Sequence, residues 1–296
     1  MDPTKQTAVI TGAASGIGRA SVSCMLQAGW RIFATVRKAE DGSRLRSECG
    51  SGVTPLLMDV TDRASITAAA DQVATQVGPQ GLDGLVNVAG IGMVRPMEYA
   101  SADDLHSIFE INAFGQIAVT QAFLPSIRRA SGRIVNISSV GAHFAIPFGG
   151  LLNASKSAFG IMCDALRMEL HPFGIRVSII EPGAIRTPAV DKTLGHVDTI
   201  IAQLPPSGQQ QYAAMLKAFA PRAYQREMHG SPPEEVAQSV YHALTAATPR
   251  LRYRVGKHSR LLSTLSSLLP DNLFESLLLR ITGLPTGFGS LPAAKE

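Results

Sequence analysis

The sequence predicts an α/β fold, a doubly wound parallel sheet with helices on both faces, and three observations lead to it. Short apolar segments rich in β-branched residues alternate with longer segments of helical periodicity from residue 7 to residue 181. A glycine-rich stretch, TGAASGIG at 11–18, separates the first apolar segment from the first helical one. The 296 residues, 45% hydrophobic and 17% charged, suit one large domain, because no internal repeat or low-complexity linker divides them.

The strands are predicted from short apolar runs bounded by turn-forming or polar residues. We expect strands at 7–10, 31–36, 53–58, 82–87, 132–137, 175–181 and 252–255. The helices are predicted at 15–28, in a polar stretch ending at 49, and at 65–77, 103–129 and 152–171. Gly29 follows the first helix as a C-cap-like stop.

Residues 188–232 break this alternation. They contain several prolines and the polar stretch 208–211, which predict a mobile insertion with short helices. Because the insertion follows Pro182 and Gly183 at the carboxyl end of a strand, we expect a substrate lid, with a variable surface excursion as the alternative.

The C-terminal part contains two leucine-rich segments separated by Pro270. We expect two helices that pack on the domain or on a neighbouring subunit; a peripheral membrane contact or the wall of an apolar substrate pocket is the alternative. The chain thus divides into a Rossmann domain at 1–260, which includes the lid, and a helical extension at 261–296. The apolar residues of the two segments are Leu261, Leu262, Leu265, Leu268 and Leu269, then Phe274, Leu277, Leu278 and Ile281.

Composition argues against several classes of function. The net charge is +4, but the basic residues are scattered and form no solid basic face, so we expect no nucleic-acid partner. The three cysteines, Cys24, Cys49 and Cys163, lack metal-ligand spacing, so we expect reduced thiols, a cytoplasmic protein and no metal site. No charged segment followed by an apolar one opens the chain, and no run of about 18 apolar residues occurs, so neither a signal peptide nor a spanning helix is expected.

The glycine-rich stretch has the context of a dinucleotide-binding turn, since it follows a strand and opens a helix. Gly12 permits a tight turn, Gly16 a close approach to a pyrophosphate, and Gly18 close packing of helix on strand. The helix start, with Ser15 and Ile17, supplies free N–H groups to the phosphates.

The second strand indicates which dinucleotide is bound. No carboxylate stands near its end to hold a ribose 2′-hydroxyl, and Arg37 follows it directly. A guanidinium suits a 2′-phosphate, so NADP(H) is favoured and NAD(H) is the alternative. Arg37 as a solvated surface charge is the other interpretation.

Four further motifs accompany this turn in order: NVAG at 87–90, Asn112, Ser139 thirteen residues before Leu152-Asn153-Ala154-Ser155-Lys156, and PGAIRT at 182–187. With the glycine-rich turn they resemble the short-chain dehydrogenase/reductase family over about residues 5–260. Segments 171–175, 181–185 and 252–256 resemble its retinol/17β-hydroxysteroid dehydrogenase-like branch.

The resemblance implies a set of cofactor contacts. Asp59, with Val60 beside it, would contact the adenine. Asn87, Ala89 and Gly90 would line the adenosine ribose, and Lys156 would hold the nicotinamide ribose. The residues that would position the carboxamide are Pro182, Gly183, Ile185 and Thr187.

The resemblance also implies a catalytic tyrosine that this chain lacks. In the family, that tyrosine exchanges a proton with the substrate oxygen, beside a serine, a lysine and an asparagine. Here Ser139, Lys156 and Asn112 stand at the matching positions, but Leu152 stands at the tyrosine position. His143 is the nearest titratable substitute in sequence, and Tyr99, Tyr212 and Tyr224 are further candidates.

Three functions remain open: a redox enzyme with a weakened or rerouted proton path, a non-redox enzyme such as a cyclase, isomerase or dehydratase, and a nucleotide-binding pseudoenzyme. The resemblance implies a hydrophobic ligand of steroid, terpenoid or polyketide type, and a homodimer or homotetramer formed through the two long helices. The residues expected to line the ligand pocket are Ile91, Met93, Val94, Phe144, Ile146, Phe148, Leu151 and Leu152.

Overall fold

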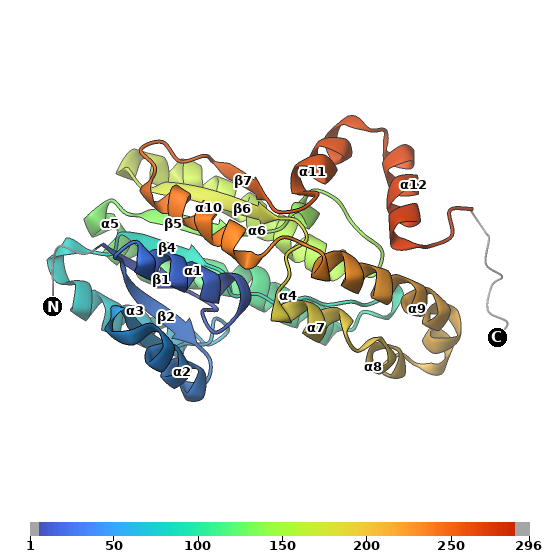
Figure 1. Ribbon diagram of the computed structural model, residues 1–296, viewed down its shortest axis with the longest axis horizontal. Coiled ribbons are helices and arrows are strands. Elements are labelled where there is room, and N and C mark those ends of the chain that lie inside the picture. Colours follow the sequence, from blue (N-terminus) through green and yellow to red (C-terminus); the bar gives the residue numbers. More distant parts are fainter. Residues whose placement is uncertain (1–5, 288–296) are drawn as a thin grey trace.

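Seven parallel strands form one sheet in the order β3-β2-β1-β4-β5-β6-β7 (Figure 1). The computed structural model describes residues 6–287; the N-terminal segment at 1–5 and the end of the predicted extension at 288–296 lie outside the described residues. All seven predicted strands are confirmed, and those at 7–10, 31–36 and 252–255 have the predicted bounds. The strands are β1 (Thr7–Ile10), β2 (Arg31–Val36), β3 (Val53–Leu57), β4 (Gly84–Asn87), β5 (Arg133–Ile137), β6 (Arg176–Pro182) and β7 (Arg252–Val255).

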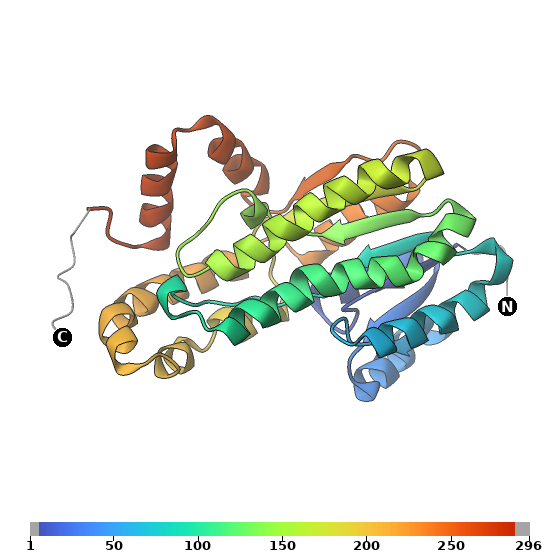
Figure 2. The ribbon, with the colours of Figure 1, turned by 180° about the vertical axis from the view of Figure 1, so that it is seen from behind.

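Helices cover both faces of the sheet, as a doubly wound fold requires. One face carries α1 (Gly16–Gln27), α2 (Ala39–Cys49) and α10 (Pro233–Thr245). The other carries α3 (Arg63–Val77), α5 (Gly115–Ala130) and α6 (Gly150–Leu170), seen from behind in Figure 2. The strand order reverses between β1 and β4, and ligands of such sheets bind at that point, beyond the carboxyl ends of the strands. Short 3₁₀ turns lie at Gly50–Gly52, Gly78–Gln80, Met97–Tyr99, Val140–Ala142 and His171–Phe173.

The helix predicted at 103–129 is interrupted. It consists of α4 (Ala102–Phe109), a π-helical turn (Glu110–Phe114) and α5. Asn112 lies in the π-helical turn and is completely buried. Such turns are frequent at functional sites, since they redirect one side chain without ending the helix.

Helix α10, which begins directly after the insertion at 188–232, is not among the predicted helices. Proline at a first helical position is favourable, and Pro233 begins the helix. The apolar residues follow helical spacing and are buried against α1 and the sheet, so the signal was present. They are Val236, Ala237, Val240, Ala243 and Leu244.

The insertion at 188–232, which we call the lid, has a hydrophobic core of its own. It contains α7 (Pro188–Leu194), α8 (Val197–Ala202) and α9 (Pro206–Met228). The prediction of short helices is wrong for α9, which runs for 23 residues with Pro221 inside it. Phe219 of α9 packs edge-on against Phe148, in a cluster that also holds Val94. The lid therefore packs on the loops that follow β4 and β5.

The two predicted tail helices are present as α11 (Ser259–Leu268) and α12 (Asp271–Thr282), which project together from the body (Figure 1). In α12 the expected packing is confirmed, since Phe274 and Leu278 are buried and Phe274 contacts the Phe144 ring. Leu279 of α12 and Leu284 after it join the hydrophobic cluster of the lid.

Helix α11 buries a different face from the one that its leucine spacing predicts. It buries Ser259 and Ser263, whereas Leu261 and Leu268 are 56% and 74% exposed. Ser259 is held inward by its hydroxyl, which donates to the Glu181 carbonyl at 2.8 Å. The expected packing is therefore wrong for Leu261 and Leu268, whereas Leu262, Leu265 and Leu269 are half-buried. Within residues 6–287 no helix combines the length and the apolar character needed to span a membrane.

Candidate active site

The glycine-rich turn has the backbone shape that its sequence predicts. Gly12 and Gly16 adopt left-handed φ angles of +62° and +53°, which favour glycine. A Cβ on Gly18 would lie 2.2 Å from the Gly12 carbonyl oxygen, so helix and turn pack too closely for any other residue. Ser15, the N-cap of α1, makes no side-chain cap bond, and Ile17 packs against the core. The first amides of α1 thus lack a side-chain cap.

The loop after β4 is fastened to this turn by residues that the sequence analysis did not single out. The Thr11 hydroxyl accepts hydrogen bonds from the Val88 and Ala89 amides at 2.8 and 3.0 Å. Gln116 of α5 donates to the Ala89 carbonyl at 2.6 Å. Both side chains are buried. A polar residue on the buried face of a helix must find a hydrogen-bond partner, and this pattern could have indicated the role of Gln116 from the sequence.

The Asn87 side chain is buried between two strands and a helix. It is 1% exposed and donates to the Thr120 hydroxyl and the Asn136 amide oxygen, each at 2.8 Å. Asn87 ties β4 to β5 and α5.

Asn112, Ser155 and Lys156 form one buried group. The Asn112 amide oxygen accepts from the Ile91 N–H at 2.8 Å, and its nitrogen donates to the Ser155 hydroxyl at 3.1 Å. Gly90 lies between them, because a Cβ there would come 3.1 Å from the Asn112 oxygen and 3.4 Å from Lys156 Nζ. The structure therefore brings together residues predicted from three separate motifs.

The Lys156 ammonium is the buried charge of this group. Its Nζ donates to the Ile137 carbonyl at the end of β5, at 2.8 Å. Burial lowers the pKa of Lys156 to about 8 from 10.5, and the nearby Cys163 acts weakly in the opposite direction. No carboxylate pairs with this ammonium among residues 6–287.

Ser139 and Leu152 lie beside this group. Ser139 is half-buried and accepts the Gly141 amide at 3.0 Å, while Asn153 of α6 donates to the Gly141 carbonyl at 2.7 Å. Leu152 is half-buried one helical turn before Lys156, which places the two side chains on one face of α6. An alkyl side chain can neither donate nor accept a proton, so no transfer step passes through Leu152.

His143 is engaged elsewhere. Its Nε2 lies 2.9 Å from the Glu181 carboxylate, which is completely buried and also pairs with Arg252 and, at 3.6 Å, with Arg254. Burial would raise the pKa of Glu181, but the hydrogen bonds and charges of His143 and Arg252 together hold it below its ordinary value. These contacts oppose the expectation that His143 replaces the missing tyrosine.

Of the three tyrosines considered as substitutes, Tyr99 and Tyr212 hold the lid to the body, and Tyr224 joins two helices within the lid. Tyr212 donates to Glu98 and Tyr224 to Asp191, each at 2.7 Å. Tyr99 donates to Gln211 at 2.8 Å. The hydrogen bond to Glu98, aided by burial, raises the pKa of Tyr212 to about 12.

The remaining predicted cofactor residues lie at the carboxyl ends of neighbouring strands. Arg37 is exposed directly after β2. Asp59 follows β3, where its carboxylate accepts the Thr61 amide and hydroxyl, and Val60 beside it is buried.

The segment after β6 reaches the glycine-rich turn. Gly183, next to Pro182, donates its N–H to the Val255 carbonyl at 2.8 Å, and Ile185 is buried. A Cβ on Gly16 would lie 3.2 Å from the Thr187 side chain, so Thr187 covers the turn.

The depressed pKa of Lys156 predicts a pH-dependent stability. Between pH 8 and 10.5 the unfolded chain holds a proton that the folded protein has lost, so the free energy of unfolding should rise with pH. The rise attributable to Lys156 is at most about 3 kcal/mol. Lys156→Met should remove this slope and stabilise the protein near pH 7. Urea unfolding of both proteins across this range measures the difference, and parallel pH profiles would contradict the prediction.

Comparisons with known proteins agree with this geometry. The family model described as short chain dehydrogenase matches residues 6–197. Retinol dehydrogenase 5 from Homo sapiens is 36% identical over 278 residues, covering 91% of this chain and 86% of its own. The 17-beta-hydroxysteroid dehydrogenase type 6 from Rattus norvegicus is 34% identical over 274 residues, covering 91% and 86%.

Solved structures give the same fold. A short-chain dehydrogenase from Streptomyces avermitilis superimposes with a TM-score of 0.71 at 26% identity, covering 95% of this chain and 96% of its own. A short chain dehydrogenase from Burkholderia cenocepacia, solved in complex with NADP, gives 0.70 at 24% identity, covering 95% and 99%. The sheet order, the glycine-rich turn, the buried lysine and these matches lead to one conclusion: the chain belongs to the short-chain dehydrogenase/reductase family.

Proposed function

We propose that the protein is a divergent oxidoreductase that binds NADP(H) and a hydrophobic ketone or alcohol, with redox chemistry weakened because Leu152 occupies the tyrosine position. One observation carries this proposal. Helix α6 presents Leu152 one turn before the buried Lys156. Asn112 and Ser139 are held by hydrogen bonds, and the glycine-rich turn is held by close packing.

The residues present fit a dinucleotide. The left-handed Gly12 and Gly16 and the close packing at Gly18 leave backbone, rather than side chains, facing the start of α1. Gly90 keeps the Lys156 ammonium clear of a neighbouring side chain, since a Cβ there would lie 3.4 Å from Nζ. When bound, the nicotinamide would supply or accept the hydride.

The chain's own groups would orient the reactants. Lys156 would hold the ribose hydroxyls through its ammonium, and Asn112 would keep the Ile91 backbone and Ser155 in place. Ser139 would hydrogen-bond the substrate oxygen. A positioned acid contributes about 10²–10⁴-fold to rate, so without one the reaction should be slower by about that factor.

The substrate is proposed to be apolar, of retinoid, steroid, terpenoid or polyketide type. The names of the dehydrogenase relatives support this choice, since they refer to retinol and a hydroxysteroid. Ile91, Met93, Ile146 and Leu152 are half-buried and available to a ligand, whereas Phe148 packs inside the lid cluster.

The alternative proposals are a non-redox enzyme on the same scaffold, such as a cyclase, isomerase or dehydratase, and a nucleotide-binding pseudoenzyme. The engagement of His143, Tyr99, Tyr212 and Tyr224 in other contacts favours these alternatives, since it leaves no evident proton donor among the four.

A cytoplasmic location and a homo-oligomer are part of the proposal. The three free cysteines support the former. For the latter, Phe114 at the start of α5, and Ile161 and Met168 on α6, are 46%, 69% and 66% exposed, an apolar surface suited to a second copy. The exposed leucines of α11 fit the alternative of a peripheral membrane contact.

Restoring the phenol tests the proposed function. We expect the native protein to bind NADPH but oxidise it slowly with a panel of hydrophobic ketones. Leu152→Tyr should increase kcat by about 100-fold or more, because it supplies the acid. Leu152→Phe is the matched control, since it adds the ring without the hydroxyl.

Fluorescence titration of NADPH tests whether all three proteins retain the cofactor site. Equal rates for the Tyr and Phe variants would place Leu152 outside the reacting position. A native protein as fast as the Tyr variant would show a different proton donor.

Arg37 tests the choice of cofactor. Arg37→Asp should lower the ratio of NADPH to NADH affinity about tenfold or more, since it removes a charge-assisted bond to the 2′-phosphate. Arg63→Asp, an equally charged change on the exposed start of α3, serves as the control. An unchanged ratio in Arg37→Asp would make Arg37 a surface charge.

The oligomer is tested on α6. Ile161→Glu should convert the homo-oligomer to monomers in size-exclusion chromatography with light scattering, because it buries a charge in the contact. Leu57→Glu, at a site 64% exposed on β3, should leave the assembly intact. A native protein that runs as a strict monomer would refute the proposed association.

A further inference from the structure

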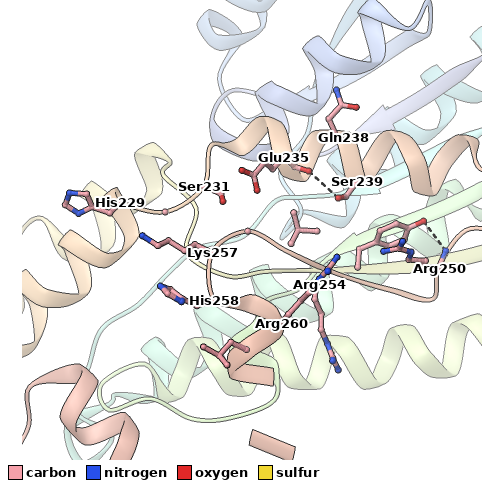
Figure 3. A pocket seen from close by; sticks show the side chains of 15 residues that line it. His229, Ser231, Glu235, Gln238, Ser239, Arg250, Arg254, Lys257, His258 and Arg260 are labelled. Carbon is pink, nitrogen blue, oxygen red and sulfur yellow. Dashed lines mark hydrogen bonds between the residues drawn. The ribbon is translucent and has the colours of Figure 1, made fainter. Parts of the chain in front are cut away.

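A cavity opens along the sheet edge at β7 and has a volume of about 810 Å³ (Figure 3). Its walls come from the end of α9, from α10, from β7 and from the loop 256–258 that leads into α11. The strand β7 is the outermost strand on its side of the sheet, and β4, β5 and β6 stand between it and β1 in the strand order.

The lining of this cavity is strongly basic. Glu235 is the single carboxylate among its lining residues, so the local potential is positive and attracts anions. The basic residues are His229, Arg250, Arg254, Lys257, His258 and Arg260.

Three of these side chains form no ion pair within the described part of the chain. Lys257, His258 and Arg260 are exposed and have no ion-pair partner among residues 6–287. Arg254, in contrast, lies 3.6 Å from Glu181, and Arg250 lies over the Tyr253 ring. In Figure 3, Lys257 and His258 lie at the same end of the cavity as His229.

The backbone of loop 256–258 is held in an unusual shape. His258 has a left-handed φ of 65°, which is unfavourable for a residue with a Cβ, and it caps α11 without a side-chain bond. The loop is anchored by the Ala184 N–H, which donates to the Lys257 carbonyl at 3.3 Å. Strain that the surroundings maintain is common at binding sites, and here it brings the amino end of α11 to the cavity.

We propose that this cavity is a binding site for a phosphate-type anion, held mainly by Lys257 and Arg260 at the start of α11. Guanidinium, ammonium and helix-start N–H groups together are the donors that bind phosphate oxygens. The volume exceeds that of a phosphate group, so an organic portion fits as well. Leu261, an exposed apolar residue, lines the same cavity and suits a ligand with an apolar chain.

This chemistry is shared by a free phosphorylated compound and by a phospholipid headgroup, and two measurements distinguish them. Inorganic phosphate is titrated by calorimetry at constant ionic strength. Co-sedimentation is measured with phosphatidylcholine vesicles that contain phosphatidic acid, with pure phosphatidylcholine vesicles as the reference. The test variant is Lys257→Ala/Arg260→Ala. Its matched control, Arg44→Ala/Arg63→Ala, removes two exposed cations from α2 and α3.

We expect the test variant to lose about tenfold in affinity and the control to keep native affinity, since each surface cation contributes modestly. Phosphate binding that is lost in this way identifies a free anion as the source. Binding to phosphatidic acid vesicles alone, lost in the same variant, identifies a headgroup.

Arg37→Ala separates this site from the proposed 2′-phosphate contact: phosphate binding that is lost in Arg37→Ala and kept in the test variant belongs to that contact and overturns the proposal. Absence of binding in both measurements, or equal losses in the test and control variants, overturns the proposal.

Discussion

Parallel strands end with backbone groups that have no strand partner, and buried groups of this kind must find a hydrogen bond. Three side chains satisfy them at the switch point of this sheet. Thr11 accepts two amides of the loop after β4, Gln116 donates to the Ala89 carbonyl, and Asn112 binds both the N–H and the carbonyl of Ile91. Because these bonds tie the turn after β1 to the helices behind the sheet, they also set where the glycine-rich turn stands relative to Lys156.

In the same site, the groups suited to bind a dinucleotide are different from the group that would transfer a proton. The groups suited to hold a dinucleotide are backbone and a buried cation, and their arrangement does not require a phenol. Lys156 illustrates this, because its ammonium bonds to the Ile137 carbonyl and is neighboured by Gly90, both independent of Leu152. A protein of this family can therefore keep its cofactor surface while its proton path changes, and binding and turnover then vary independently.

Much of the fold was predictable, since apolar runs and turn residues mark every strand and glycine marks the first turn. The errors have physical causes. A π-helical turn leaves helical periodicity almost unchanged, so the break around Asn112 was hidden. Leucine spacing in α11 predicted a buried leucine face, but Ser259, which bonds to β6, and Ser263 are the buried residues, and Leu261 and Leu268 are exposed. In the site, residue types predicted the Asn112 and Lys156 group, whereas the engagement of Asn87 and His143 depends on distant partners, Asn136 and Glu181.

The cluster that Leu279 and Leu284 share with α9 has a thermodynamic consequence. The lid and the tail bury one another's apolar surface. The boundary expected near residue 260 therefore separates two segments of the sequence that share one hydrophobic cluster. Unfolding of the tail would therefore also expose apolar surface of the lid.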